Sequence, residues 1–302
     1  MIDELRAQKY FSKQKPEKIV FLGHVKYQSG MQDLSYADDG SVLAWKKGTT
    51  VFVGATGKAV KAPEDIGFLF CGLDTLKEID ANRLDTSAVR NMCYLFYDDR
   101  KLEKVHIEEW NTENTRVMCC VFFRCVSIRE LDLHKWDVSN VTDASGIFCT
   151  GDNYLGNGAL EKLNLDSWSP DSLVKADSMF YGCGNLTELN VADWNMSKVI
   201  TVNHMFADCF SLKILNVSKW DMSSCRDFDA VFNDCRSLTV IDVSKWDFLS
   251  ATRMSQMFER CTSVQSIHIR MHTVQKCNDF GEIFNELKVK GDLINGEFIK
   301  WQ

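Results

Sequence analysis

The residues that could carry out chemistry are twelve cysteines and six histidines. Cys119, Cys120 and Cys125 lie close together in the sequence, but their spacing matches no zinc-binding pattern. The sequence contains no phosphate-cradling Gly-Lys motif, no nucleophile elbow and no H-E-x-x-H motif. We therefore expect no enzymatic activity, no catalytic residues, no bound metal and no cofactor.

Five of the cysteines recur three residues after a phenylalanine, which points to packing. They are Cys125, Cys183, Cys209, Cys235 and Cys261. Free cysteine packs as a small buried hydrophobe, so we expect reduced thiols in the core. Disulfides between adjacent copies of this position are the alternative.

The elements that would position these residues are copies of one repeat. A phenylalanine returns every 26 residues, with one interval of 32 between Phe148 and Phe180. The positions are Phe70, Phe96, Phe122, Phe148, Phe180, Phe206, Phe232, Phe258 and Phe284. A fixed period of this length is typical of a solenoid, in which each unit buries its apolar face only against its neighbours.

Each unit contains two apolar patterns. Around the phenylalanine, apolar residues recur at helical spacing, as at Val202, Met205 and Phe206, which predicts a helix of about two turns. The pattern L-x-x-L-x-L follows, as at Leu212 and Leu215, and predicts a strand. The predicted fold class is therefore α/β, a solenoid with a parallel sheet on one face and short helices on the other.

A tryptophan follows the strand in six units. These residues are Trp110, Trp136, Trp168, Trp194, Trp220 and Trp246. We expect stacked units to place the six rings in one column within the core.

The repeats also carry a family resemblance. The units DVSNVTDASGIF, NMSKVITVNHMF and DMSSCRDFDAVF, each joined to L-x-x-L-x-V-x-x-W or a close variant, resemble the BspA-like leucine-rich repeats, also known as the domain of unknown function 285 family. The resemblance covers about residues 66–284, and the segment before it resembles the cap that precedes such arrays. It implies a parallel-sheet solenoid and brings no catalytic residues. Many members of the family are bacterial surface or secreted proteins associated with adhesion.

Three regions follow from these patterns. Residues 1–66 form an N-terminal cap with a helix near residues 3–14 and a β-hairpin built from SVLAW and TTVFVGA. Residues 67–284 form the repeats, and residues 285–302 form a C-terminal cap. Caps cover the apolar ends that a solenoid would otherwise expose.

The strand residues that point away from the core form the expected working surface. Eight residues after each phenylalanine, charges alternate in five units, and then the apolar Ile214 and Val240 appear. An exposed apolar patch of this kind indicates a partner site, whereas the polar residues could equally hydrogen-bond along the sheet. The candidate partner-binding residues are Asp132, Asn190, Ile214, Asn216, Ser218, Val240, Asp242, Ser244, His268 and Arg270.

One insertion interrupts the array at residues 151–158. It is rich in glycine and polar residues, and it contains Asp152, Asn153 and Tyr154. Insertions in solenoids often lie on a binding rim, so these three residues are a candidate rim loop. The alternative is a tolerated surface loop.

The charge is uneven along the chain. The net charge is −7, and residues 1–67 hold 10 Lys and Arg against 8 Asp and Glu, so the remainder carries −9. An acidic body argues against nucleic acid as the main ligand, because phosphate contacts need local positive charge.

The segment MIDELRAQKYFSKQ has no apolar signal core, and no run reaches transmembrane length. We therefore expect no membrane insertion, and a cytoplasmic location if Met1 is the native start; otherwise the protein is secreted or lies at the cell surface.

The function predicted from these features is a non-enzymatic scaffold that binds a protein partner through the sheet face. The free protein is expected to be monomeric. Two alternatives use the same surface. One is a secreted or surface adhesin of a bacterium, and the other is an inhibitor from a phage or mobile element that acts on a host enzyme such as a nuclease.

Overall fold

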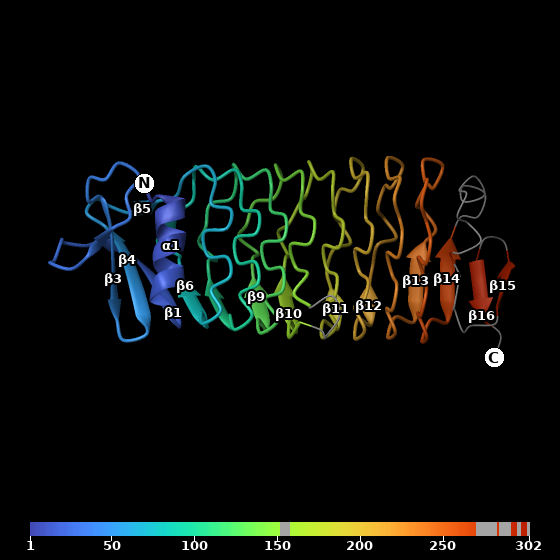
Figure 1. Ribbon diagram of the computed structural model, residues 1–302. Helices are drawn as coiled ribbons and strands as arrows, with labels where there is room; N and C mark the ends of the chain where they lie inside the picture. Colours follow the sequence, from blue (N-terminus) through green and yellow to red (C-terminus); the bar gives the residue numbers. More distant parts are fainter. Residues whose placement is uncertain (152–157, 270–282, 284–290, 295–296, 301–302) are drawn as a thin grey trace.

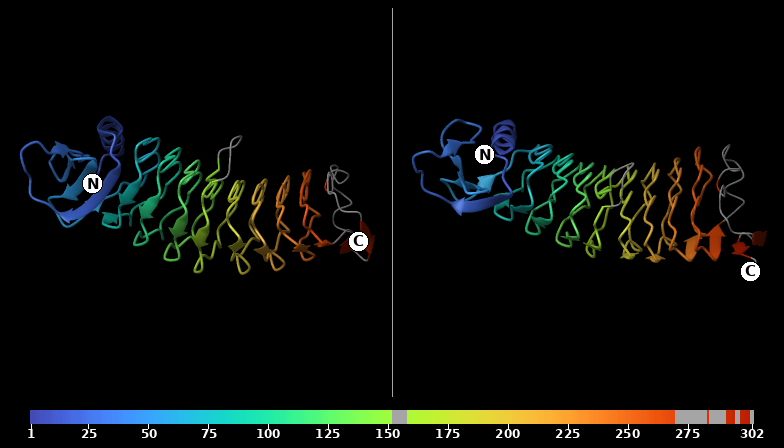
Figure 2. Two further views of the ribbon diagram at one scale, coloured as in Figure 1. Left: turned by 90° about the horizontal axis from the view of Figure 1, so that it is seen from below. Right: turned by 60° about the horizontal axis from the view of Figure 1, so that its bottom comes forward.

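The computed structural model describes residues 1–151, 158–269, 283, 291–294 and 297–300. Successive coils of the chain stand side by side in one row, with the strands of the coils along one face (Figure 1). The row is elongated, and β16 lies at the end opposite α1 (Figure 2). The predicted solenoid with a parallel sheet on one face is thus confirmed.

The N-terminal cap contains one helix and five strands. Its strands β1–β4 join β6 and β8 of the first coils in a six-stranded sheet of order β2-β3-β4-β1-β6-β8. Because β1 pairs in parallel with β6, with Lys18 opposite Glu78, the cap continues the sheet of the coils. The bounds are α1 Glu4–Gln14, β1 Lys18–His24, β2 Gln32–Asp33, β3 Val42–Lys47, β4 Thr50–Ala55 and β5 Val60–Lys61.

Helix α1 forms where local capping signals and an apolar face coincide. The carboxylate of Asp3 accepts a hydrogen bond from the Arg6 backbone N–H at 2.9 Å, which caps the helix N-terminus. The helix ends at Lys15, whose left-handed backbone (φ 46°) returns its N–H to the Phe11 carbonyl. The Phe11 ring stacks on Phe70 of the first coil at 5.8 Å, so α1 covers the end of the core.

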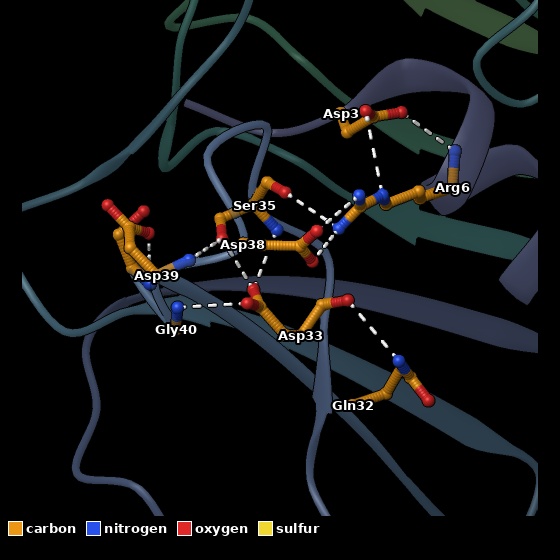
Figure 3. Close-up of polar contacts among 9 residues, drawn as sticks. Asp3, Arg6, Gln32, Asp33, Ser35, Asp38, Asp39 and Gly40 are labelled. Carbon is orange, nitrogen blue, oxygen red and sulfur yellow. Dashed lines mark hydrogen bonds and ion pairs between the residues drawn. The ribbon is translucent and has the colours of Figure 1, made fainter.

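A polar network holds the loop after β2 to α1 (Figure 3). The Asp33 carboxylate accepts hydrogen bonds from the Ser35 N–H at 2.8 Å and the Gly40 N–H at 2.9 Å. The Arg6 guanidinium pairs with the Asp38 carboxylate through both of its terminal nitrogens. These contacts fix the position of β2 relative to the helix.

Each coil contributes one short strand to the sheet. The strands pair in parallel with equivalent residues opposite one another, as Glu78 opposite Lys104 and Val240 opposite Ser266. The short β7 lies after β6 and pairs with β5 of the cap. The bounds are β6 Glu78–Asp80, β7 Leu84–Asp85, β8 Lys104–His106, β9 Glu130–Asp132, β10 Lys162–Asn164, β11 Glu188–Leu189, β12 Ile214–Leu215, β13 Val240–Val243 and β14 Ser266–Ile269.

The last described strands are antiparallel. β15 (Gly291–Ile294) and β16 (Glu297–Lys300) form a hairpin, and β16 pairs with β14. The other residues of the predicted C-terminal cap at 285–302 lie outside the described residues, as does Phe284.

The face opposite the sheet differs from the prediction of short helices. Around Phe206, every second backbone N–H donates to the next coil instead of to its own. These bonds are His204 N to Asp229 O at 2.8 Å, Phe206 N to Val231 O at 2.9 Å and Asp208 N to Asn233 O at 2.9 Å. The N–H groups between them close turns of four residues, such as Met205 N to Val202 O at 3.0 Å. An α-helix would instead direct each N–H to the fourth residue before it.

Left-handed residues make this arrangement possible. The residue two positions before each core phenylalanine has φ between 53° and 64°. These residues are Phe68, Tyr94, Cys120, Gly146, Ser178, His204, Ala230 and Gln256. A residue with positive φ ends any helix, so this face is a stack of turns and inter-coil hydrogen bonds. Of the described residues, only Glu4–Gln14 form an α-helix.

Two aromatic columns fill the core; the tryptophan column was predicted as one file of six rings and is found as two stacked runs. The phenylalanines stack from Phe11 to Phe258, with neighbouring rings 5.3–6.2 Å apart. The tryptophans stack as Trp110 on Trp136 and as a run from Trp168 to Trp246, with centroids 6.0–6.4 Å apart. Every one of these rings is buried.

The predicted cysteine column consists of free, buried thiols. Each thiol donates to the phenylalanine carbonyl of the preceding coil. The Sγ to O distances run from 2.9 Å for Cys125 to Phe96 up to 3.3 Å for Cys209 to Phe180. These carbonyls also accept a backbone N–H of their own coil, as from Cys209 N to Phe206 O at 3.2 Å, so the thiol supplies a second donor to each of them.

Asp99 occupies the cysteine position in the second coil. Its side chain is fully buried, and Oδ1 accepts a hydrogen bond from the Leu73 N–H at 2.6 Å. Oδ2 has no hydrogen-bond partner among the described residues. Burial raises the pKa of the Asp99 carboxyl well above its ordinary value.

We expect Asp99→Cys to stabilise the protein at pH 7, because it removes a buried oxygen without a partner, but by less than the roughly 1–3 kcal/mol that such a group costs, because it also removes the acceptor of the Leu73 N–H. The folded state holds the Asp99 proton more tightly than the unfolded state, so the wild type loses stability as pH rises above about 4. The gain should therefore shrink between pH 7 and pH 4.5. Urea unfolding at both pH values measures it, with the exposed Asp74→Cys as the matched control. A lower urea midpoint for Asp99→Cys at pH 7 would contradict this account.

Candidate functional site

The outward face of the strands forms a wall along the whole row of coils (Figure 1). The side chains eight positions after each phenylalanine, or fourteen after Phe148 because of the six-residue insertion, form one column on it. The strand registers place these equivalent residues opposite one another. The column begins in the cap with Lys18 and continues with Glu78, Lys104, Glu130, Lys162, Glu188, Ile214, Val240 and Ser266.

The N-terminal part of this column pairs its own charges. Lys18 Nζ lies 2.6 Å from Glu78 Oε1, and Lys162 Nζ lies 2.6 Å from Glu130 Oε1. The hydrogen bond from Lys18 lowers the pKa of the Glu78 carboxyl below its ordinary value. Exposed pairs of this kind add little stability, but they offer a partner few unpaired charges.

The polar column two positions further on has a local structural role. Asp132, Asn216 and Asp242 each accept a hydrogen bond from the backbone N–H two residues later, which closes an Asx turn. The distances are 3.3 Å from His134, 3.2 Å from Ser218 and 3.0 Å from Ser244. The side chains of these candidates therefore bond within their own coil, and Asp132 also hydrogen-bonds along the sheet to Asn164 on β10.

The apolar part of the wall is exposed where the sequence predicted it. Ile214 is 64% exposed and Val240 is 48% exposed. Among the described strands of the coils, β6 and β8–β14, these are the large apolar side chains that face solvent. Neither contributes to the core, so their apolar character has no role in folding that the structure shows.

The remaining candidates are less defined. Asn190 is exposed, and its Nδ2 donates to Asp166 Oδ1 at 3.4 Å. His268 is half-buried on β14, opposite Asp242 on β13. Arg270 lies outside the described residues, as do Asp152, Asn153 and Tyr154 of the candidate rim loop.

An acidic groove on the same wall was not predicted. It has a volume of about 1070 Å³ and extends over β8, β9, β10 and β11. It crosses two places where neighbouring strands belong to separate ladders, between β8 and β9 and between β10 and β11. Six carboxylates line it against three Lys and Arg side chains. The alternating strand charges were the only trace of it in the sequence.

A disulfide was also missed. Cys93 and Cys119 are bonded, with Cα atoms 4.6 Å apart, and they occupy the same position in adjacent coils. Cys119 is thereby removed from the possible metal ligands considered above, and Cys125 donates to a carbonyl in the core. The structure shows no cluster of three or more His, Cys, Asp or Glu side chains able to hold a metal ion among the residues it describes.

The fold and the wall together define the class of protein. Short parallel strands, one per 26-residue coil, with a leucine-rich inner face and an uncovered outer face, make this a leucine-rich-repeat solenoid. Solenoids of this class present extended surfaces suited to protein interaction. The helix in the described part of the chain is too short to span a bilayer.

Comparison with known proteins places the chain in a family. The model described as "Mycoplasma protein of unknown function, DUF285" matches residues 64–188 and again 174–296. The chain belongs to this family, which confirms the BspA-like resemblance. No curated protein matches the chain. A solved leucine-rich-repeat protein from Leptospira interrogans is similar at 11% identity over 68% of each chain, with a TM-score of 0.25.

Proposed function

We propose that this protein is a non-enzymatic scaffold that binds a protein partner through the outward face of its strands. The exposure of Ile214 and Val240 carries the proposal. Apolar side chains that face solvent without supporting the core are typical of an interface. The flanking binding residues are Asn190, Asn216, Ser218, Asp242, Ser244 and His268, with Asp132 at the edge.

The stacked coils make the wall rigid before any partner binds. Phenylalanine and tryptophan columns hold each coil against the next, so binding orders little of the chain. The free protein is monomeric in this proposal, and the partner supplies the complementary apolar surface.

The double substitution Ile214→Asp and Val240→Asp tests the site. We expect at least a tenfold loss in partner capture, because two charges would be desolvated in the apolar centre of the interface. Affinity capture from native lysate with quantitative mass spectrometry measures the loss. Leu249→Asp is the matched control, since Leu249 is 52% exposed but lies outside the strands. Equal capture by the double variant, with an unchanged circular dichroism spectrum, would contradict the proposal.

A secreted or surface adhesin is a second candidate, and the disulfide favours it. Disulfides persist in oxidising compartments, whereas cytosolic reductants keep most thiols reduced. The Cys93–Cys119 bond joins adjacent coils at the first part of the array. Differential alkylation of the protein in its native cells tests this candidate. Fully reduced Cys93 and Cys119 would argue for the cytoplasmic scaffold.

A further inference from the structure

The cap carries a second groove that the proposed function does not use. It lies on the outer face of the cap sheet, between β3 and the loop that follows β1, and has a volume of about 600 Å³. Strands β4 and β1 separate β3 from the first coil strand, β6. The groove therefore lies at the opposite end of the protein from Ile214 and Val240.

The floor of this groove is apolar and rigid. Leu22 of β1, Trp45 of β3 and Phe52 of β4 are partly exposed, whereas Phe21, Ala44 and Val53 beside them are buried. The Trp45 ring stacks on Phe52 at 5.5 Å, across the β3–β4 hairpin. Met31 adds a flexible thioether to the lining. An apolar side chain from a ligand would find a preformed aromatic surface here.

The wall of the groove is held by a close approach between chain segments. Val25 packs directly on Gly54 of β4, where a Cβ atom would lie 2.5 Å from Val25 Cγ1. Glycine at this position therefore lets the loop after β1 approach the hairpin. The polar network of Asp33 and Ser35 holds β2, which begins one residue after Met31 (Figure 3).

The rim of the groove is basic, although the protein is acidic overall. Lys26, Lys46 and Lys47 line it, and no acidic residue does. Lys46 Nζ donates to the Gln14 carbonyl at 2.5 Å, and within the described chain none of the three lysines forms an ion pair. The Lys46 side chain is thereby directed toward α1, on the face of the hairpin opposite Trp45, so Lys26 and Lys47 are the two cationic groups beside the apolar floor. In a chain of net charge −7, they select for an anionic ligand.

The edge of β3 indicates the shape of that ligand. β2 pairs with β3 only at Leu43 and Ala44, so Trp45–Lys47 lie on the outer edge of the six-stranded sheet beyond β2. Sheet edges of this kind accept an extended peptide as an added strand. In a strand, every second side chain points to the same face, about 6.6 Å apart. A groove of this size accepts one or two such side chains.

We propose that the cap groove binds an extended acidic segment of a partner protein, with an apolar side chain on Trp45 and Leu22 and carboxylates at Lys26 and Lys47. Nucleic acid is disfavoured, because a row of phosphates needs a continuous basic stripe on the protein, whereas the strand wall of the coils next to the cap is acidic. The segment lies beside β3. The lysines at the rim select for its negative charge, and the apolar floor selects for its apolar side chain.

A peptide library tests this site on the full chain. Nine-residue peptides in which every second position is randomised among Asp, Glu and apolar residues, with Ser between them, are selected against the immobilised protein, so that acidic and apolar side chains share one face of the strand. A matched library carries Lys and Arg in place of the acids. We expect enrichment from the acidic library alone. The best member, labelled with fluorescein, should bind in an anisotropy titration and weaken as salt rises.

Matched variants locate the binding. Lys26→Glu with Lys47→Glu should weaken the peptide at least tenfold, whereas Lys9→Glu with Lys13→Glu on α1 makes the same change in net charge and should have little effect. Trp45→Ser should weaken the peptide as well, and the Ile214→Asp/Val240→Asp variant should bind it normally.

Three outcomes would overturn the proposal. They are no acidic enrichment on the wild type, equal loss in both lysine pairs, or tighter binding of duplex DNA or of phosphatidylserine vesicles than of any selected peptide. Because both lysine pairs are exposed, the comparison stands even where Trp45→Ser fails to fold.

Discussion

Trp220→Ala is expected to destabilise the array by roughly 3–5 kcal/mol, because it removes the largest side chain from the middle of the core column. Trp220 is 1% exposed and stacks between Trp194 and Trp246 at 6.4 and 6.0 Å. Its Nε1 donates to the Val191 carbonyl at 2.9 Å, and the substitution removes this buried hydrogen bond. The loss combines a cavity, two aromatic contacts and one buried hydrogen bond.

The loss of stability in Trp220→Ala should be greatest in the coils around Trp220. In a solenoid each coil contacts only its neighbours, so a cavity at Trp220 weakens the coils around it most. Hydrogen exchange read by mass spectrometry should show faster exchange in residues 200–250 than in the cap. Trp220→Phe is the control, since it keeps a ring in the column and should cost less. Uniform exchange along the chain of Trp220→Ala would contradict a nearest-neighbour array.

Loss of the Cys93–Cys119 disulfide is the second large effect. The bond closes a loop with a sequence separation of 26 residues, and for this length chain entropy predicts a stabilisation of about 3 kcal/mol. Cys93→Ser with Cys119→Ser should therefore lower the urea midpoint of unfolding substantially. Reductant should shift the wild type in the same direction.

The double serine variant provides the decisive comparison for this bond. Its urea midpoint should not respond to reductant, whereas the midpoint of the wild type should fall. Cys71→Ser is a matched control, because Cys71 is a partly exposed free thiol in the preceding coil. If reductant shifted the double variant as far as the wild type, the stabilisation would belong to other cysteines.

The positions of the strands and of the core columns could be predicted because they follow from the repeat period and do not depend on the backbone conformation within each coil. Whatever the detailed geometry, residues in equivalent positions of stacked coils lie above one another. Glu78 opposite Lys104 and Trp194 on Trp220 follow from the period alone. The exposure of Ile214 and Val240 followed equally, because alternate residues of a strand point to opposite faces.

The helices were predicted wrongly because the same apolar spacing serves two backbones. Val202, Met205, Phe206 and Cys209 are all buried, as a helix face would be. Their N–H groups alternate between turns within the coil and bonds to the next coil. The spacing of apolar residues predicts which side chains point inward, but it does not predict which acceptors the backbone N–H groups bond to.

The disulfide and the two grooves depended on contacts that no periodic pattern contains. Cys93 and Cys119 share a position in adjacent coils, so a signal existed, but cysteines elsewhere in the array share positions without bonding. The cap groove joins Leu22 to Trp45 across a sheet whose strand order differs from the order in the chain.

By itself, the sequence determined the period, the columns of the core, the strand wall and the family of this protein, because stacking brings equivalent residues together in any solenoid. The tertiary structure alone decided the turns behind the wall, the bonded cysteine pair and the basic groove of the cap. The turns depend on how the backbone directs its hydrogen bonds, the disulfide on how closely two equivalent cysteines approach, and the cap groove on which non-equivalent segments meet; a repeat pattern determines none of these.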